Sequence, residues 1–302
     1  MRISSMIFGA FALFLTAVAS ASTVPLRVVA SFTIPADWAR EIAGVRASVE
    51  SLVPPSADPH LYQPTLADMR KLYAADVIVA IDPTLENWFV PLVADASLRK
   101  KTLWLAQTKE TAHTVANAAQ DPHLWMDALL VVPMCNRLAE RFTQVAPADA
   151  GGFAARSAKY AVSLREIDAW AHRTLAAVPV SRRILFSHHD NLSRLANRYG
   201  LRYGGALIAN VSSESPDPSA RELAAFIRRI RKAKTPLFHD SDTAPTLVKM
   251  VTRNAALPPP VRIYSDALQP SPHPASTYLG MYRENIRIIA EALNVSPNVR
   301  LP

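Results

Sequence analysis

Short apolar segments that resemble β-strands alternate with helical segments, and this alternation occurs twice along the chain. The predicted strands cover residues 26–32, 47–53, 76–81 and 102–105 in the first half, and 183–187, 201–208, 235–238 and 261–264 in the second. Strands that alternate with helices form parallel sheets whose faces are covered by those helices. We therefore expect an α/β protein of two lobes, each with a mainly parallel β-sheet flanked by helices.

One long helical pattern separates the two halves. Apolar residues recur on one helical face from Phe153 to Val178, Gly151 and Gly152 precede the pattern, and Pro179 ends it. About 26 residues of helix extend over about 40 Å. This length favours a rigid spine helix that joins the lobes over a flexible linker. The predicted domains are an N-terminal lobe of residues 22–150, a linking helix of residues 151–178 and a C-terminal lobe of residues 179–302.

Residues 1–21 are typical of a secretory signal peptide. Arg2 precedes an apolar run from Met6 to about Ala19, and Ala19-Ser20-Ala21 is a small-x-small cleavage pattern. The run is too short to span a bilayer comfortably, although an uncleaved anchor is the alternative. No cysteine follows the run, so we expect cleavage near Ala21, a soluble periplasmic protein and no lipid anchor.

The composition limits the possible partners only weakly. The formal net charge of +8 permits contact with nucleic acid or an anionic membrane, but it is not evidence of either. The densest basic run is either a solvated helix face or a partner surface, and it comprises Arg228, Arg229, Arg231, Lys232 and Lys234. Cys135 is the single cysteine, so no internal disulfide can form and the apolar core must hold the fold.

Two copies of one short motif indicate a metal site. Asp58-Pro59-His60 and Asp121-Pro122-His123 are each followed by leucine and an aromatic residue. Proline restrains the residue before it and cannot continue a strand ladder, so each histidine lies on a stiff loop. Metal coordination tolerates little positional error. A lone histidine is more often packed or hydrogen-bonded, but the repetition favours a ligand role.

Three predicted strands of the second half end in further residues that can bind a metal. These residues are His188 or His189, His239 or Asp240, and Asp266. Together with His60 and His123, they would supply three or four nitrogen and oxygen ligands from both halves of the chain. Because the set contains no thiolate, it favours Zn²⁺, Mn²⁺ or Fe²⁺ over Cu(I).

These motifs resemble those of the cluster A-I solute-binding proteins, the zinc and manganese receptors of ABC importers. The resemblance covers nearly the whole mature chain. Besides the two Asp-Pro-His motifs, it rests on His189-Asp190 before Tyr199-Gly200-Leu201, on Pro218-Ser219-Ala220, on Asp266-Ala267-Leu268, and on Tyr282 with Asn285. The resemblance implies two α/β lobes joined by one long helix, with the metal in the cleft between them.

The resemblance implies that His60, His123, His189 and Asp266 bind the metal. In the family, the spacing between the His-Asp and Tyr-Gly motifs selects His189 as the ligand. His188 would then be a neighbour of the metal site and not a ligand. The chain departs from the family at three places. It has Phe238-His239-Asp240 where the family often has Phe-x-Glu, and Asp82-Pro83 where a glycine is usual. It also lacks a histidine-rich loop between residues 105 and 120. The remaining histidines are expected to be surface or structural residues, and they are His113, His172 and His273.

The predicted function is a monomeric periplasmic receptor that delivers a divalent metal to an ABC permease of the inner membrane, with no nucleic-acid partner. Three imidazoles and one carboxylate favour zinc, because manganese prefers oxygen ligands. Family members regarded as manganese receptors usually carry a glutamate at the position of His189. A manganese or iron receptor is the alternative within the family.

Two alternatives come from other classes of function. A zinc hydrolase would need an open metal position, but four protein ligands leave none, and the chain has no His-Glu-x-x-His or Gly-x-Ser-x-Gly motif. An adhesin is the third possibility, and no feature of the sequence supports it.

Overall fold

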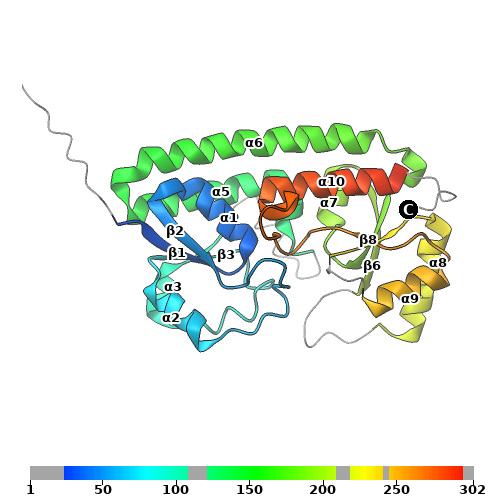
Figure 1. The fold of residues 1–302 in the computed structure, drawn as a ribbon, viewed down its shortest axis with the longest axis horizontal. Helices are drawn as coiled ribbons and strands as arrows, with labels where there is room; N and C mark the ends of the chain where they lie inside the picture. Colours follow the sequence, from blue (N-terminus) through cyan, green and yellow to red (C-terminus); the bar gives the residue numbers. More distant parts are fainter. Residues whose placement is uncertain (1–23, 108–120, 209–217, 241–244, 295–302) are drawn as a thin grey trace, which may run out of the picture.

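The computed structural model describes residues 24–107, 121–208, 218–240 and 245–294, and it shows two α/β lobes joined by one long helix (Figure 1). The predicted fold class is therefore confirmed. The predicted signal peptide, His113 and the outer ends of the two predicted lobes lie outside the described residues. No described helix combines the length and apolar character needed to cross a membrane.

The N-terminal lobe contains a parallel four-stranded sheet in the order β2-β1-β3-β4. Its strands are β1 (Leu26–Ala30), β2 (Ala47–Ser51), β3 (Val77–Ala80) and β4 (Thr102–Trp104). Its helices are α1 (Thr33–Ala43), α2 (Leu66–Ala74), α3 (Ala96–Lys101) and α5 (Ala128–Val145). Successive β3 residues face opposite sides: Val77 and Val79 pack with α1 and α5, whereas Ile78 and Ala80 pack with α2 and α3. Helices thus cover both faces of the sheet.

The C-terminal lobe repeats this architecture with a parallel sheet in the order β6-β5-β7-β8. Its strands are β5 (Ile184–His189), β6 (Arg202–Ile208), β7 (Leu237–His239) and β8 (Val261–Arg262). Its helices are α7 (Ser193–Arg198), α8 (Ala220–Ala233), α9 (Thr246–Asn254) and α10 (Tyr278–Asn294). Ile184 and Phe186 pack with α8 and α9, while Leu185 belongs to the cluster that contains α7 and α10.

Most strand ends differ from the prediction by one or two residues, and two of these differences affect the segments described below. β5 continues through His189, which pairs with Ile208 of β6, so the predicted end at Ser187 is wrong. β8 ends at Arg262, before the predicted end at Tyr264. Asn285 of α10 explains this second difference, because its side chain accepts a hydrogen bond from the Tyr264 N–H (2.8 Å) and donates one to the Tyr264 carbonyl (2.7 Å). The side-chain amide takes up the backbone groups that a longer strand would have paired.

The long helix α6 (Ala150–Ala176) lies along both lobes and packs against α1 and α5 with its N-terminal half and against α10 with its C-terminal half (Figure 1). It begins at Ala150, so Gly151 and Gly152, which precede the apolar pattern, lie in its first turn. Glycine is less favourable than alanine in a helix. The buried face of α6, which includes Phe153 and Leu164, offsets this cost.

Short 3-10 helices connect the larger elements, and they are η1 (Gly44–Arg46), η2 (Leu124–Met126), η3 (Pro147–Asp149), η4 (Val180–Arg182) and η5 (Pro274–Ser276). One apolar cluster continues from the N-terminal sheet through α6 and α10 into the C-terminal lobe. Tyr278 reinforces this junction, because its hydroxyl donates to the Trp125 carbonyl (2.6 Å) and its N–H donates to Asp37 of α1 (2.9 Å). The two lobes therefore share a core beside the segments that carry the candidate site.

Candidate metal site

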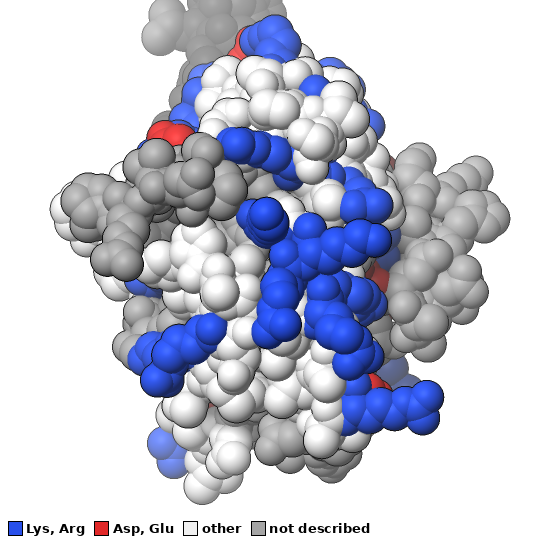
Figure 2. Space-filling view, turned by 90° about the vertical axis from the view of Figure 1, so that its right-hand side faces the viewer, with Lys and Arg blue, Asp and Glu red and all other residues white. Residues whose placement is uncertain are grey.

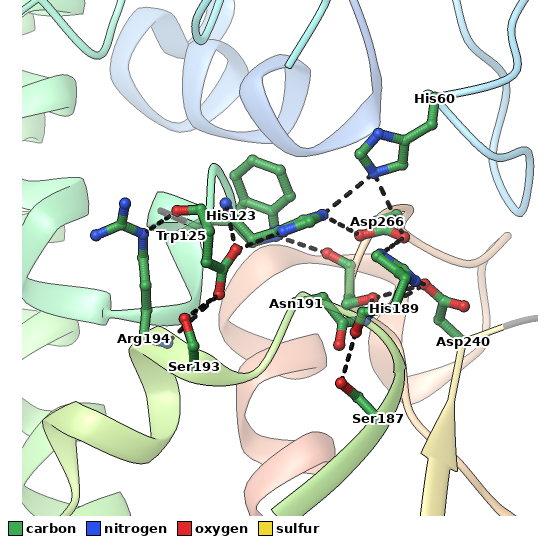
Figure 3. A network of polar contacts seen from close by, with 12 residues as sticks. His60, His123, Trp125, Ser187, His189, Asn191, Ser193, Arg194, Asp240 and Asp266 are labelled. Carbon is green, nitrogen blue, oxygen red and sulfur yellow. Dashed lines mark hydrogen bonds and ion pairs between the residues drawn. The ribbon is translucent and has the colours of Figure 1, made fainter. Parts of the chain in front are cut away.

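Four side chains from both lobes converge where the lobes meet (Figure 3). His60 lies in the loop after β2, and His123 lies directly before η2. His189 is the last residue of β5, and Asp266 follows β8 in the chain. All four sequence-predicted residues are thus brought together, and one ligand atom from each lies within 4.8 Å of the others.

The ligand atoms have the separations expected around a single ion. His60 Nε2 lies 3.1 Å from His123 Nε2, and His123 Nε2 lies 3.3 Å from Asp266 Oδ1. His189 Nε2 lies 3.2 Å from Asp266 Oδ2, and His60 Nε2 lies 3.9 Å from the same oxygen. In a tetrahedral zinc site with bonds of about 2.1 Å, neighbouring ligand atoms lie about 3.4 Å apart. The arrangement can therefore hold a tetrahedral ion at its centre with little movement.

The charges at the centre also suit a cation. Burial alone would raise the pKa of Asp266, but the adjacent His189 and His123 hold it well below its usual range, so the carboxylate is ionised. Asp266 Oδ1 and both ring nitrogens of His189 are buried and have no well-aligned hydrogen-bond partner among the described residues. Buried polar atoms without partners are costly, and a bound cation would satisfy them.

Asp121 fixes the ring of His123. Its Oδ1 lies 2.6 Å from His123 Nδ1 and accepts the His123 backbone N–H at 2.9 Å. Burial alone would lower the pKa of His123, but Asp121 and Asp266 raise it to about 10. The carboxylate on Nδ1 leaves Nε2 as the nitrogen that faces the centre, and Nε2 must release its proton when a metal binds. The C-terminal lobe holds Asp121 in turn, because Ser193 Oγ donates to its Oδ2 (2.9 Å) and Arg194 Nε donates to its carbonyl (2.5 Å).

Asp240 occupies the corresponding position beside His189. Its Oδ2 lies 3.4 Å from His189 Nδ1, and it accepts a hydrogen bond from Ser265 Oγ at 2.9 Å. Burial raises the pKa of Asp240 to about 8. Asn191 Nδ2 also donates to Ser265 Oγ (2.7 Å). The end of β7, the end of β5 and the loop that carries Asp266 are therefore joined behind the centre.

His60 is held by its backbone. Its N–H donates to Asp58 Oδ1 (2.8 Å), so both Asp-Pro-His motifs form the same aspartate-capped turn. Trp88 Nε1 donates to the Pro59 carbonyl (2.8 Å), and Thr65 forms a capping box with Asp68 at the start of α2, where the loop ends. Burial lowers the pKa of His60 to about 3, so its ring is neutral and able to bind a metal.

Trp125 connects the two lobes at the site. Its Nε1 donates a hydrogen bond of 2.6 Å to the carbonyl of Ser265, the residue directly before Asp266. Trp125 itself is fully buried and contacts Phe32, with 5.4 Å between ring centroids. One hydrogen bond therefore ties the segment of His123 to the segment of Asp266.

A second group of possible ligands shares His189 and adds His188 and Asp240, again with one atom each within 4.8 Å. It contains no residue of the N-terminal lobe. His239, which the sequence left open, is buried at the end of β7 and belongs to neither group. His172 is exposed on α6, and His273 bonds Tyr264 and the backbone of Ala275, in agreement with the surface and structural roles predicted for them.

Comparison with known proteins identifies the family. The model of a family described as "Zinc-uptake complex component A periplasmic" (ZnuA) matches residues 28–292. The chain belongs to this family. The predicted resemblance to metal receptors of ABC importers is therefore confirmed.

Individual relatives of the ZnuA family differ in the metal that their names give. "Zinc-binding protein TroA" of Treponema pallidum is 28% identical over 282 residues, which are 91% of this chain and 91% of TroA. "Manganese-binding lipoprotein MntA" of Bacillus subtilis is 26% identical over 276 residues, which are 89% of this chain and 90% of MntA. A solved structure of the TroA protein aligns with a TM-score of 0.82 at 25% identity, and covers 90% of this chain and 100% of that one.

Proposed function

We propose that this protein is a periplasmic receptor that binds one zinc ion through His60, His123, His189 and Asp266 and delivers it to an ABC permease. The observation that carries this proposal is the convergence of three imidazole nitrogens and one ionised carboxylate, with one atom of each within 4.8 Å of the others. Membership of the ZnuA family supports the transport role. Four protein ligands leave no position for a catalytic water, which agrees with binding rather than hydrolysis.

The type of ligand favours zinc over manganese. Relatives named for zinc and relatives named for manganese match this chain over similar lengths, so sequence similarity alone does not identify the metal. Neutral imidazole suits zinc, whereas carboxylate and water oxygens suit manganese. Three of the four proposed ligands are imidazoles, so the ligand set favours zinc.

Titration of the metal-free protein with zinc and with manganese at one pH tests the proposed function. Wild type should bind zinc more tightly, and His189→Glu should narrow the difference because it exchanges a nitrogen ligand for oxygens. His172→Glu makes the same change on the exposed face of α6 and should leave both affinities unchanged. A wild-type preference for manganese would contradict the assignment of zinc.

The two aspartates of the repeated motifs should differ in their effect on metal affinity. Asp121→Asn keeps an oxygen for the backbone turn but removes the charge that holds His123 Nδ1, so zinc affinity should fall about 10- to 100-fold. Asp58→Asn makes the identical change in the other motif, where the aspartate bonds the His60 backbone, and should cost much less. Calorimetric titration of both variants measures the difference. Equal losses would show that Asp121 does not act through the ring of His123.

A further inference from the structure

The outer end of the C-terminal lobe carries a dense positive charge, which Figure 2 shows as a group of Lys and Arg side chains on one side of the molecule. We define the basic face as the exposed lysines and arginines of α8, its C-cap and α9. They are Arg221, Arg228, Arg229, Arg231, Lys232, Lys234, Lys249 and Arg253. Among the described residues between 218 and 260, Glu222 is the one exposed acidic residue. The basic face therefore has a strong excess of positive charge.

The packing of α8 directs these charges outward. Phe226 and Ile230 of α8 are buried against the lobe, which leaves the basic residues on the opposite side of the helix. Arg231 donates to the carbonyl of Asn254, so α8 and the end of α9 form one continuous surface. The carboxylate of Glu222 is already engaged by Ser219 in the capping box of α8. The charges are thus presented together on a rigid surface.

No residue of the basic face forms an ion pair with any described residue. The described ion pairs of the chain lie elsewhere, for example between Arg198 and Asp168 and between Arg287 and Glu291. Like charges that are not compensated repel one another and lower the stability of the folded protein. A partner with many negative charges would remove that repulsion on binding.

The chemistry of the basic face fits a phosphate-rich surface better than a protein. Protein interfaces depend on buried apolar and aromatic anchors. None of the large exposed hydrophobic side chains among the described residues lies between residues 218 and 260. One guanidinium group can donate two parallel hydrogen bonds to a phosphate group. Five of the eight residues of the basic face are arginines. Since the family is described as periplasmic, anionic phospholipid headgroups are the phosphate surface that such a protein meets.

We propose that the basic face binds the anionic headgroup surface of a phospholipid membrane. With no apolar side chain to insert, binding is electrostatic, peripheral and sensitive to salt. Such binding would concentrate the receptor at the membrane that holds its permease. The proposal is independent of the proposed metal ligands, because none of them belongs to the basic face.

Co-sedimentation with vesicles tests this proposal on the chain that follows the predicted signal peptide, residues 22–302. Wild type should sediment with vesicles of phosphatidylcholine and phosphatidylglycerol at low salt, and should not sediment with phosphatidylcholine alone or at high salt. Each basic residue near an anionic surface strengthens binding about fivefold. Arg228→Gln with Lys232→Gln and Lys249→Gln should therefore weaken binding about a hundredfold. These three exposed side chains make no described hydrogen bond or ion pair, so folding and zinc affinity should not change.

The matched control removes the same charge from the opposite end of the molecule. Arg70→Gln with Arg99→Gln and Lys100→Gln alters exposed side chains of α2 and α3, and should leave vesicle binding nearly unchanged. Equal weakening by both triple variants would show that net charge, not this face, is responsible. Absence of lipid-dependent sedimentation would overturn the proposal. A basic-face variant that binds anionic vesicles normally but loses binding to permease in neutral lipid would assign the face to a protein partner instead.

Discussion

Zinc should raise the free energy of unfolding of the metal-free protein by about 4 kcal/mol at a thousandfold excess of free zinc over Kd. The proposed ligands come from both lobes, so they meet only in the native state, and an ion bound by all four stabilises that state alone. A change of this size corresponds to a rise in Tm of roughly 5–10 °C for a chain of this length.

Thermal unfolding of chelator-treated protein, with and without added zinc, measures this stabilisation. Asp266→Asn is the control, because it removes the ionised ligand while keeping the side-chain volume, and its Tm should respond much less to zinc. An unchanged Tm in metal-free wild type after zinc addition would contradict binding between the lobes.

His189→Ala should weaken zinc binding by at least about a hundredfold, whereas the neighbouring His188→Ala should change it little. Structural zinc sites contribute about 10–16 kcal/mol, so one of four ligands accounts for roughly 3 kcal/mol. His189 Nε2 faces Asp266 at 3.2 Å, and the His189 ring centroid lies 5.2 Å from that of His123. His188 groups only with His189 and Asp240, away from the N-terminal lobe.

Competition with a chromophoric chelator measures zinc affinities in this range for both variants. The two substitutions remove the same side chain from adjacent positions of β5, so each controls for the other. If His188→Ala abolishes binding while His189→Ala leaves it intact, the ion occupies the second group of ligands and our assignment is wrong.

Features that depend on local sequence could be predicted. The capping box of Thr65 and Asp68 involves residues only three positions apart, so the sequence alone contains the whole pattern. The apolar residues of β3 predict a strand buried on both faces, because each face needs its own apolar side chains. The repeated Asp-Pro-His motifs and the ends of the predicted strands indicated His60, His123 and Asp266 of the candidate site, and the resemblance selected His189 over His188.

Features that depend on distant residues could not be predicted. Trp125 and Ser265 are 140 positions apart, and Ser193 and Asp121 are 72 positions apart, so nothing local indicates that they bond. The early end of β8 likewise depends on Asn285, which lies in the distant helix α10. The role of Asp240 stayed open because its contact with His189 exists only once β5 and β7 pair. The sequence did indicate that Asp240 could lie at the site, because it is a polar residue at the end of a predicted central strand.

The most direct test of the central claim is anomalous diffraction at the zinc absorption edge from crystals of the zinc-loaded protein. Our account predicts one strong peak at about 2.0–2.2 Å from His60 Nε2, His123 Nε2, His189 Nε2 and an oxygen of Asp266. A peak beside His188 and Asp240, or a zinc ion that contacts only one lobe, would contradict it.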